Sequence, residues 1–277
     1  MIPKTIHLCW LSGDPYPKKI QFCIDSWKKY LPDFEIMLWD TKRFDVNSLT
    51  WTRQAFEAKK YAFVADYIRL YAVYNYGGIY FDSDVEVIRP FDDLLDLPYF
   101  LGSEVERDRP EMAAFGAEKG TAWLKDAMER FTDRVFVKEN GEWDIGDIPT
   151  VVGKMLHEKY EWTPIENLSE FDPDPSKICV LPVEWFNAHP RVDAHTLKYE
   201  ITPNTRSIHH FANSWTDWEY VGGPLHKLYY KITGKDWLLG DNRFKLYGAK
   251  KNKKSYPRPY ICAGSAETRI PRRYSSA

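Results

Sequence analysis

Residues 61–84 constrain the fold of this chain more than any other stretch. Apolar residues at helical spacing predict a helix over 61–76. The pair Gly77-Gly78 ends this helix, because glycine is the usual residue just past a helix end. The compact apolar run 79–81 predicts a buried strand, and it leads directly into Asp82-Ser83-Asp84. The segment therefore predicts a helix packed on a sheet, with carboxylates where a strand ends.

The rest of the pattern predicts an α/β sheet. A strand over 4–10, a helix over 17–30 and a strand over 34–39 form a βαβ opening, which places a ligand crevice at the carboxyl ends of the strands. Further helices are predicted over 51–59, 121–131, 149–159 and 224–232, and further strands over 85–88, 98–103, 111–116, 178–181 and 207–211.

Composition and charge exclude several classes of protein. A formal net charge of -2 argues against a polycation that binds nucleic acid. No run of about 18 apolar residues is present, so we expect no transmembrane helix, and the apolar stretch at the start is too short for a signal peptide. Four scattered cysteines without a C-x-x-C pair favour a reducing compartment and no structural zinc. We therefore expect a cytoplasmic location.

The C-terminal end differs from the rest in charge. From Lys245 onward there are nine Lys or Arg residues and one acid, Glu267. We expect a single domain over 1–247 and a basic tail over 248–277. A solvated surface explains such a tail. Peripheral contact with the anionic inner face of a membrane, where lipid-linked acceptors reside, explains it as well.

Asp82 and Asp84 are the first candidates for chemistry. In an extended segment their side chains point the same way, and Ser83 points the other way. Two such carboxylates repel each other unless a cation lies between them. Hard oxygen ligands suit Mg²⁺ or Mn²⁺. A bare D-x-D pattern is common by chance. Its place after a buried strand strengthens the prediction of a metal site.

Three further places carry candidate residues. Asp66 and Arg69 lie three apart and share one face of an otherwise apolar helix, which favours a cleft over a surface ion pair. One histidine of His209-His210 can supply a third metal ligand, although a lone histidine is more often a core or surface residue. Trp10 follows the first strand and can stack on a nucleobase or fill the core.

Three segments together resemble a known family. They are Ile2-Pro3-Lys4-Thr5-Ile6-His7-Leu8-Cys9-Trp10, the run from Ala65 through Asp82-Ser83-Asp84, and His209-His210-Phe211-Ala212-Asn213-Ser214-Trp215. They are similar to the D-x-D glycosyltransferases of family 32, which include capsular-polysaccharide synthesis enzymes and yeast-type α-mannosyltransferases, and which are relatives of the glucosylating clostridial toxins. The chain departs from the family at Gly146-Asp147-Ile148-Pro149, where a Gly-Pro pair is usual.

The resemblance implies a GT-A fold, which is a Rossmann-like nucleotide-binding sheet with the D-x-D at a strand end. It implies that Asp84 binds the metal directly and that Asp82 reaches the metal, ribose or sugar. It implies catalytic contacts of Asp66 and Arg69 with the sugar and phosphate of the donor. His210 would bind the metal and close over the pyrophosphate. The remaining residues implied at the nucleotide-sugar site are Leu8, Trp10, Tyr80, Ser83, Ser214 and Trp215.

The function implied is a retaining, Mn²⁺- or Mg²⁺-dependent transfer of a hexose from a nucleotide-sugar to a glycan or lipid-linked saccharide, as in polysaccharide biosynthesis. UDP-hexose is the first expectation for the donor and GDP-mannose the second. Two alternatives remain open at this point: a toxin-like protein glycosyltransferase, and a nucleotide-sugar binding module without turnover. A nucleotidyltransferase is disfavoured, because the chain lacks a Gly-rich G-x-G-x-x-G phosphate loop.

Overall fold

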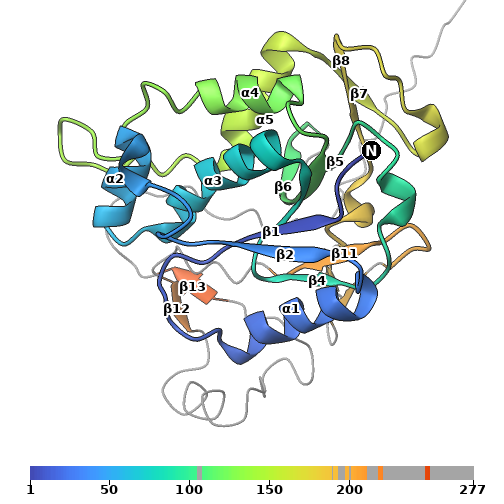
Figure 1. Cartoon of the computed structure of the whole chain (residues 1–277), viewed down its shortest axis with the longest axis horizontal. Coiled ribbons are helices and arrows are strands. Elements are labelled where there is room, and N and C mark those ends of the chain that lie inside the picture. The colour runs from blue at the N-terminus through green and yellow to red at the C-terminus, as the bar shows by residue number, and fades with distance from the viewer. Residues whose placement is uncertain are drawn as a thin grey trace, which may run out of the picture.

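The computed structural model describes residues 1–104, 108–188, 190–192, 197–199, 201–210, 218–220 and 247–249. This part of the chain is built around a five-stranded mixed sheet in the order β2-β1-β3-β6-β5 (Figure 1). Strand β1 pairs parallel with both β2 and β3, and β6 runs antiparallel to both of its neighbours, β3 and β5. The strands are β1 (Thr5–Cys9), β2 (Glu35–Trp39), β3 (Gly78–Phe81), β5 (Tyr99–Ser103) and β6 (Pro110–Ala117).

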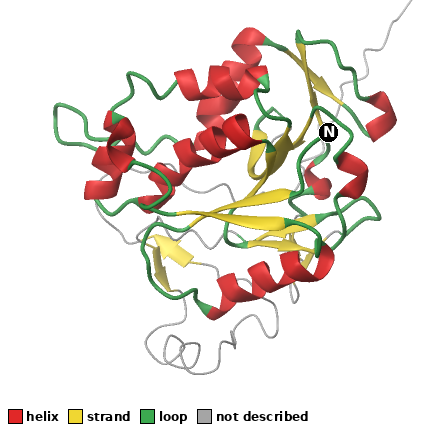
Figure 2. Cartoon of the chain, viewed as in Figure 1, coloured by secondary structure: helices red, strands yellow, loops and turns green. Residues whose placement is uncertain are grey.

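Helices cover both faces of this sheet (Figures 1 and 2). Helix α1 lies on one face, and helices α3, α4 and α5 lie on the other, with α2 beside α3. Their bounds are α1 (Lys18–Tyr30), α2 (Thr50–Glu57), α3 (Tyr61–Tyr76), α4 (Ala122–Glu129) and α5 (Ile148–Lys159). Short 3-10 turns occupy Val46–Ser48, Asp92–Leu94, Leu168–Glu170 and Val183–Trp185.

The alternation of side chains along β3 gives the protein two hydrophobic cores. Ile79 and Phe81 pack on the α1 side, where the Trp27 ring lies 5.4 Å from that of Phe81. Tyr80 points to the α3 side, where its ring lies 5.8 Å from Phe115. Both faces of β3 are therefore buried, which explains why its sequence is a continuous apolar run.

A second, two-stranded sheet begins immediately after β3. Strand β4 (Val85–Val87) leaves the main sheet and pairs antiparallel with β11 (Ser207–His209), with Val85 opposite His209. The other described pairs are β7 (Glu161–Pro164) with β8 (Lys177–Val180), β9 (Pro190–Val192) with β10 (Leu197–Tyr199), and β12 (Trp218–Tyr220) with β13 (Tyr247–Ala249).

The predicted α/β class and the parallel βαβ opening are confirmed. One local expectation is wrong, because Asp82-Ser83-Asp84 is a turn instead of extended chain. The amide of Val85 donates to the carbonyl of Asp82 at 3.0 Å, and this turn lets β4 join a different sheet. Strand β7 was not predicted, since Glu-Trp-Thr-Pro lacks apolar alternation. The helix predicted over 224–232 and nearly all of the basic tail lie outside the described residues.

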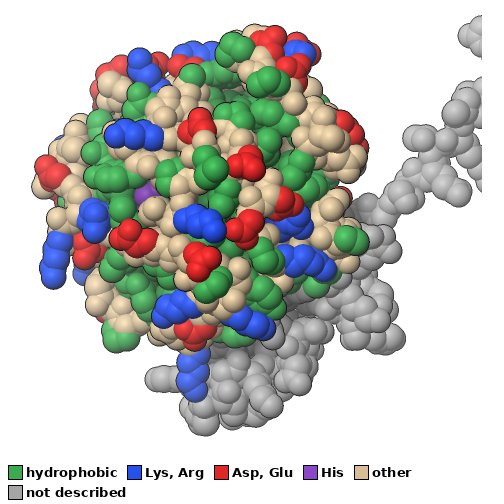
Figure 3. All heavy atoms as spheres, turned by 45° about the vertical axis from the view of Figure 1, so that its right-hand side comes forward, with side chains coloured by type: hydrophobic (Ala, Val, Ile, Leu, Met, Phe, Trp, Pro, Cys, Tyr) green, Lys and Arg blue, Asp and Glu red, His purple; other side chains and the backbone are tan. Residues whose placement is uncertain are grey.

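The described surface is mixed in charge. Acidic and basic side chains are interspersed over the face in Figure 3, in line with the small net charge of -2. Within the described residues, no helix combines the length and the apolar character that crossing a membrane requires.

The Gly78 backbone provides a test of how α3 joins the sheet. Gly78 has φ of +109°, and an added Cβ would lie 2.5 Å from the carbonyl oxygen of Thr5 on β1. Gly120 has a similar φ of +81°, but no atom lies within 4 Å of its added Cβ. We expect Gly78→Ala to lower the free energy of unfolding by roughly 3 kcal/mol or more, and Gly120→Ala by about 1 kcal/mol. Urea denaturation measures both, and equal losses would contradict this account of the junction.

Candidate functional site

A cleft of about 730 Å³ opens at the carboxyl ends of β1 and β3. Its volume lies within the usual range for a small-molecule site. Cys9 and Trp10 at the end of β1, Lys19 at the start of α1, and the Asp82-Ser83-Asp84 turn line it. This is where an open α/β sheet normally holds its ligand.

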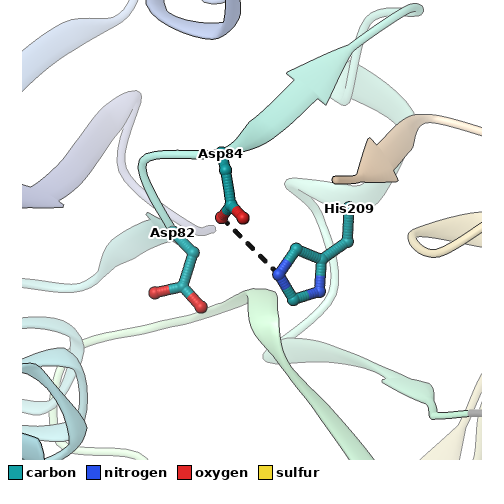
Figure 4. A group of neighbouring side chains, drawn as sticks. All are labelled: Asp82, Asp84 and His209. Atoms are coloured by element: carbon teal, nitrogen blue, oxygen red, sulfur yellow. Dashed lines mark ion pairs between the residues drawn. The ribbon is translucent and has the colours of Figure 1, made fainter. Parts of the chain in front are cut away.

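Asp82, Asp84 and His209 form a cluster in this cleft (Figure 4). One ligand atom from each residue lies within 4.8 Å of those from the other two. The Nε2 atom of His209 is 3.5 Å from Oδ1 of Asp84. The pairing of β11 with β4 brings His209 here from more than a hundred residues further along the chain.

The cluster fits a divalent cation. An octahedral ion with bonds of about 2.1 Å holds neighbouring ligand atoms about 3 Å apart and opposite ones about 4 Å apart. The ligand atoms of the two carboxylates and the imidazole lie within 4.8 Å of one another, slightly wider than this span, and such a set suits Mn²⁺ or Mg²⁺. Burial lowers the pKa of His209, but Asp84 and Glu111 raise it more, to about 9. Protonated His209 therefore offsets the carboxylates, and a bound ion would take over that positive charge.

His210 does not take the position predicted for it. Its Nε2 atom lies 2.9 Å from Oε2 of Glu86, and the residue is only 2% exposed. Its backbone amide donates to the carbonyl of Asp84 at 3.1 Å. Consecutive residues at a strand end face opposite sides, so only one histidine of the pair can face the carboxylates. The structure brings His209 to them, which corrects the predicted choice of His210 as the metal ligand.

Arg69 holds Asp82 in place. Its Nη1 atom donates to Oδ2 of Asp82 at 3.2 Å and to the carbonyl of Met112 at 2.8 Å, and its Nη2 donates to Oδ1 of Asp66 at 2.9 Å. The hydroxyl of Tyr80 donates to the other oxygen of Asp82 at 2.7 Å. Both oxygens of Asp82 are therefore fixed before any ligand binds.

Arg69 and Asp66 are buried, at 5% and 7% exposure. Burial raises the pKa of Asp66 to about 7, although Arg69 acts in the opposite direction. Burial lowers the pKa of Arg69, but Asp82, Tyr80 and Asp66 together raise this pKa by more, so the guanidinium stays charged. The predicted contact of Arg69 with a donor phosphate is not the role that these hydrogen bonds favour. They make Arg69 a residue that orients Asp82.

The predicted nucleotide-binding residues divide between cleft and core. Trp10 and Ser83 line the cleft, and the indole of Trp10 donates to the carbonyl of Asp14 at 2.7 Å and meets the Tyr16 ring edge-on. Leu8, which was also predicted at the nucleotide-sugar site, is 2% exposed, packs in the core on the α1 side and is not among the residues that line the cleft. Alternation along β1 turns it away from the cleft. The predicted Ser214 and Trp215 lie outside the described residues.

Among the charged residues that line the cleft, sequence reasoning missed Lys19, Glu104, Arg109 and Glu111. Nη2 of Arg109 lies 3.0 Å from Oε2 of Glu104 and 3.0 Å from Oδ1 of Asp147. Asp147 also accepts from the amide of Thr150 as the N-cap of α5. Burial, together with Glu111, raises the pKa of Glu104 to about 7. The only local signal for Glu111 is its position as an acid inside the apolar run of β6, and the sequence analysis did not use it.

Comparison with known proteins finds a family model that matches the part of the chain that carries this cleft. Residues 17–101 match the family model described as glycosyltransferase sugar-binding region containing DXD motif. The match spans α1, α3 and the Asp82-Ser83-Asp84 turn. It confirms the resemblance predicted from the sequence, and together with the sheet described above it supports the expected GT-A type of fold.

Two curated proteins that are similar to part of this chain have names that contain mannosyl and ceramide. Inositol phosphoceramide mannosyltransferase 3 of Schizosaccharomyces pombe is 34% identical over 35% of this chain and 28% of its own length. Mannosyl phosphorylinositol ceramide synthase CSH1 of Saccharomyces cerevisiae is 34% identical over 36% of this chain and 28% of its own length. The chain thus aligns with little more than a quarter of each relative.

One solved structure, the PaToxG glycosyltransferase, covers 57% of this chain and 68% of its own, with a TM-score of 0.44 and 19% identity. A TM-score at this level does not define a shared fold.

Replacement of Arg69 tests its role in holding Asp82. Arg69→Lys keeps the charge, but one ammonium group cannot reach Asp66, Asp82 and Met112 together. We expect the free energy of unfolding to fall by about 3 kcal/mol, because carboxylates are left buried without their partner. The measurement is urea denaturation.

Arg53→Lys is the matched control for this prediction. Arg53 forms a surface pair with Glu57 at 3.6 Å, and its side chain is 42% exposed. Such a pair contributes roughly 0.5 kcal/mol or less, so the control should be nearly neutral. Comparable losses in the two variants would refute the role assigned to Arg69.

Proposed function

We propose that this chain, whose residues 17–101 match the D-x-D glycosyltransferase model, transfers a hexose from a nucleotide-sugar donor with the help of a divalent cation and with retention at the anomeric carbon. The observation that carries the proposal is the meeting of Asp82, Asp84 and His209 in one cleft at the end of β3. A retaining transferase of this kind needs a place for a cation beside the donor phosphates, and this cluster provides the ligands for one.

The residues of the cleft divide the work. Bound to the cluster, the divalent ion supplies positive charge to the leaving diphosphate. Tyr80 and Arg69 keep the carboxylate of Asp82 turned into the cleft. Trp10 lines the cleft, where its flat indole ring can stack on the base of the nucleotide. We assign Asp84 and His209 to the ion, and Asp82 to the ion or to a hydroxyl of the donor.

For retention of configuration at the anomeric carbon, we favour a route in which the acceptor attacks from the same face of the sugar as the departing phosphate. In this route the acceptor hydroxyl reaches the anomeric carbon from the side that the phosphate leaves, and the departing phosphate takes the proton. The alternative requires an enzyme carboxylate as nucleophile. Glu111 is the carboxylate of the cleft that we consider for this role, but its Oε1 accepts from the amide of Ala113 and its Oε2 from Asn187. Its oxygens are committed to holding the fold, which favours the first route.

The names of the two relatives bear on the substrates. Both are named for transfer of mannose, which moves a mannosyl donor ahead of other hexoses as the first to test. Both names also contain inositol phosphoceramide or its mannosylated form, which favours a lipid-linked acceptor that carries a phosphate. A saccharide acceptor remains the alternative. Contact of the basic tail with a membrane, and a cytoplasmic location, stay predictions.

A donor panel tests the function. We expect slow release of nucleoside diphosphate from one sugar nucleotide among GDP-mannose, UDP-glucose, UDP-galactose and their N-acetyl forms. The release should need Mn²⁺ or Mg²⁺ and stop with EDTA, because the ion balances the charge of the leaving group. The release is measured by chromatography of the nucleotides. Tight donor binding by calorimetry without any release, with and without candidate acceptors, would instead identify a binding module.

A pair of histidine variants tests the metal cluster. His209→Ala should weaken Mn²⁺ binding at least tenfold and lower donor turnover about a hundredfold, because it removes one of three ligands. His210→Ala should leave Mn²⁺ affinity within about twofold and lower the melting temperature, because it removes one hydrogen bond of the buried Glu86 carboxylate. Calorimetry with Mn²⁺ and thermal unfolding measure the two effects. If His210→Ala weakens Mn²⁺ binding more than His209→Ala does, then His210 is the metal ligand, as the sequence predicts.

A further inference from the structure

Glu111 lies behind His209, on the side opposite the D-x-D turn. Its Oε1 atom is 3.6 Å from Nδ1 of His209, while Nε2 of the same ring is 3.5 Å from Oδ1 of Asp84. The imidazole therefore stands between two carboxylates that come from different elements, Glu111 from β6 and Asp84 from the turn before β4. Each ring nitrogen faces one of them.

Two buried hydrogen bonds hold Glu111 still. Its Oε1 accepts from the backbone amide of Ala113 at 2.8 Å, and its Oε2 accepts from Nδ2 of Asn187 at 2.7 Å. Glu111 is 3% exposed and Asn187 is fully buried. The carboxylate has little freedom to rotate, so it presents a fixed face to the ring of His209.

We propose that Glu111 is the positioning residue of the metal site. Through Nδ1 of His209 it sets the tautomer and the direction of the ring, so that Nε2 is turned toward Asp82 and Asp84 as a ligand for a divalent cation. A metal-binding histidine commonly gives its second ring N–H to a carboxylate in this way, and the partner decides which nitrogen binds the metal. The inference rests on the proposed function, because it concerns the same cation.

A purely structural role explains Glu111 less well. All eight residues of β6 are buried, and the rest of the strand is Pro, Met, Ala, Phe and Gly. A carboxylate in such a strand costs stability unless it is fully paired. An apolar residue would fill the position without that cost. The ring of His209 is the partner that Glu111 shares with the cleft.

The chain contains its own matched control. Glu86 and His210 form a second buried carboxylate–histidine pair, one residue further along the same two-stranded sheet, with 2.9 Å between Oε2 and Nε2. This pair does not include either residue of the D-x-D turn. Glu111→Gln and Glu86→Gln therefore each remove one buried carboxylate charge beside a histidine. Glu111→Gln removes it beside His209, which belongs to the cation cluster, and Glu86→Gln removes it beside His210, which does not.

The experiment compares these two variants of the full chain. We measure Mn²⁺ affinity by electron paramagnetic resonance of the free ion, without donor, and then kcat and KM for the donor that the wild type hydrolyses. Glu111→Gln should lower Mn²⁺ affinity about 10- to 100-fold, the usual loss when such a partner is removed. Glu86→Gln should stay within about twofold. The glutamine at 111 can be accommodated, because Oδ1 of Asn187 is buried without a hydrogen-bond partner and can accept after an amide flip.

A double variant shows whether Glu111 acts through His209. In the His209→Ala background, Glu111→Gln should change Mn²⁺ affinity less than twofold, because the ring that it orients is gone. Circular dichroism confirms that each variant is folded. Should Glu111→Gln fail to fold, Glu111→Asp, which keeps the charge but withdraws it by one methylene, is expected to show several-fold weaker Mn²⁺ binding.

The possible outcomes separate the two proposals. A wild type that binds Mn²⁺ and releases nucleoside diphosphate, with Glu111→Gln or Glu111→Asp no weaker in Mn²⁺ than Glu86→Gln, overturns the inference and leaves the function standing. An undiminished effect of Glu111→Gln in the His209→Ala background also overturns it. A wild type that neither binds Mn²⁺ nor releases any nucleotide overturns the function and the inference together.

Discussion

The buried guanidinium of Arg69 is the interaction on which the arrangement of the site depends. It is 5% exposed and lies between Asp66 on its own helix and Asp82 at the end of β3. Removing this cation from water is costly, and the paired carboxylates, the carbonyls of Met112 and Ala65 and the ring of Tyr80 offset the cost. The pairing also ties α3, β3 and β6 together at one point. A helix that is otherwise packed by apolar residues is thus fixed in rotation by one charged contact, and Asp82 is fixed with it.

Beyond Arg69, the charge of the cleft is balanced incompletely. Asp66, Asp82, Asp84 and Glu111 lie near one another, Arg69 and His209 pair with them, and Lys19 and Arg109 also line the cleft. Burial and mutual repulsion work against four ionised carboxylates. The protein relieves part of this by raising the pKa of Asp66 to about 7 and by keeping His209 protonated. Under the proposed function, a bound divalent cation would relieve more of it, because the ion would bring positive charge without needing the proton on His209.

Local sequence predicted the local parts of this design. The spacing in α3, the Gly77-Gly78 stop, β3 and the position of the D-x-D after it are all coded within 61–84, and the structure places these elements in the expected order, with a turn at the D-x-D in place of extended chain. The choice between His209 and His210 was out of reach, because it depends on the register of β11 against β4, which joins residues far apart in the chain. The burial of Leu8 away from the cleft was out of reach for a related reason, since only the pairing of β1 shows which face of the strand meets the cleft. Glu111 was hidden because its partners, Asn187 and His209, come from two other segments.

The turn at Asp82-Ser83-Asp84 explains why the ligands come from such distant segments. If β3 had continued straight, Asp84 would stay in the main sheet, and its neighbours would be β1 and β6. The turn instead sends β4 out to pair with β11, so Asp82 remains with the main sheet while Asp84 and His209 belong to the second one. The metal cluster therefore lies at the junction of two sheets. An ion that binds both sides of a junction stabilises the joined form by its own binding free energy. Under the proposed function, a donor whose phosphates also bound this ion would strengthen that junction at the moment when the sugar must be held still.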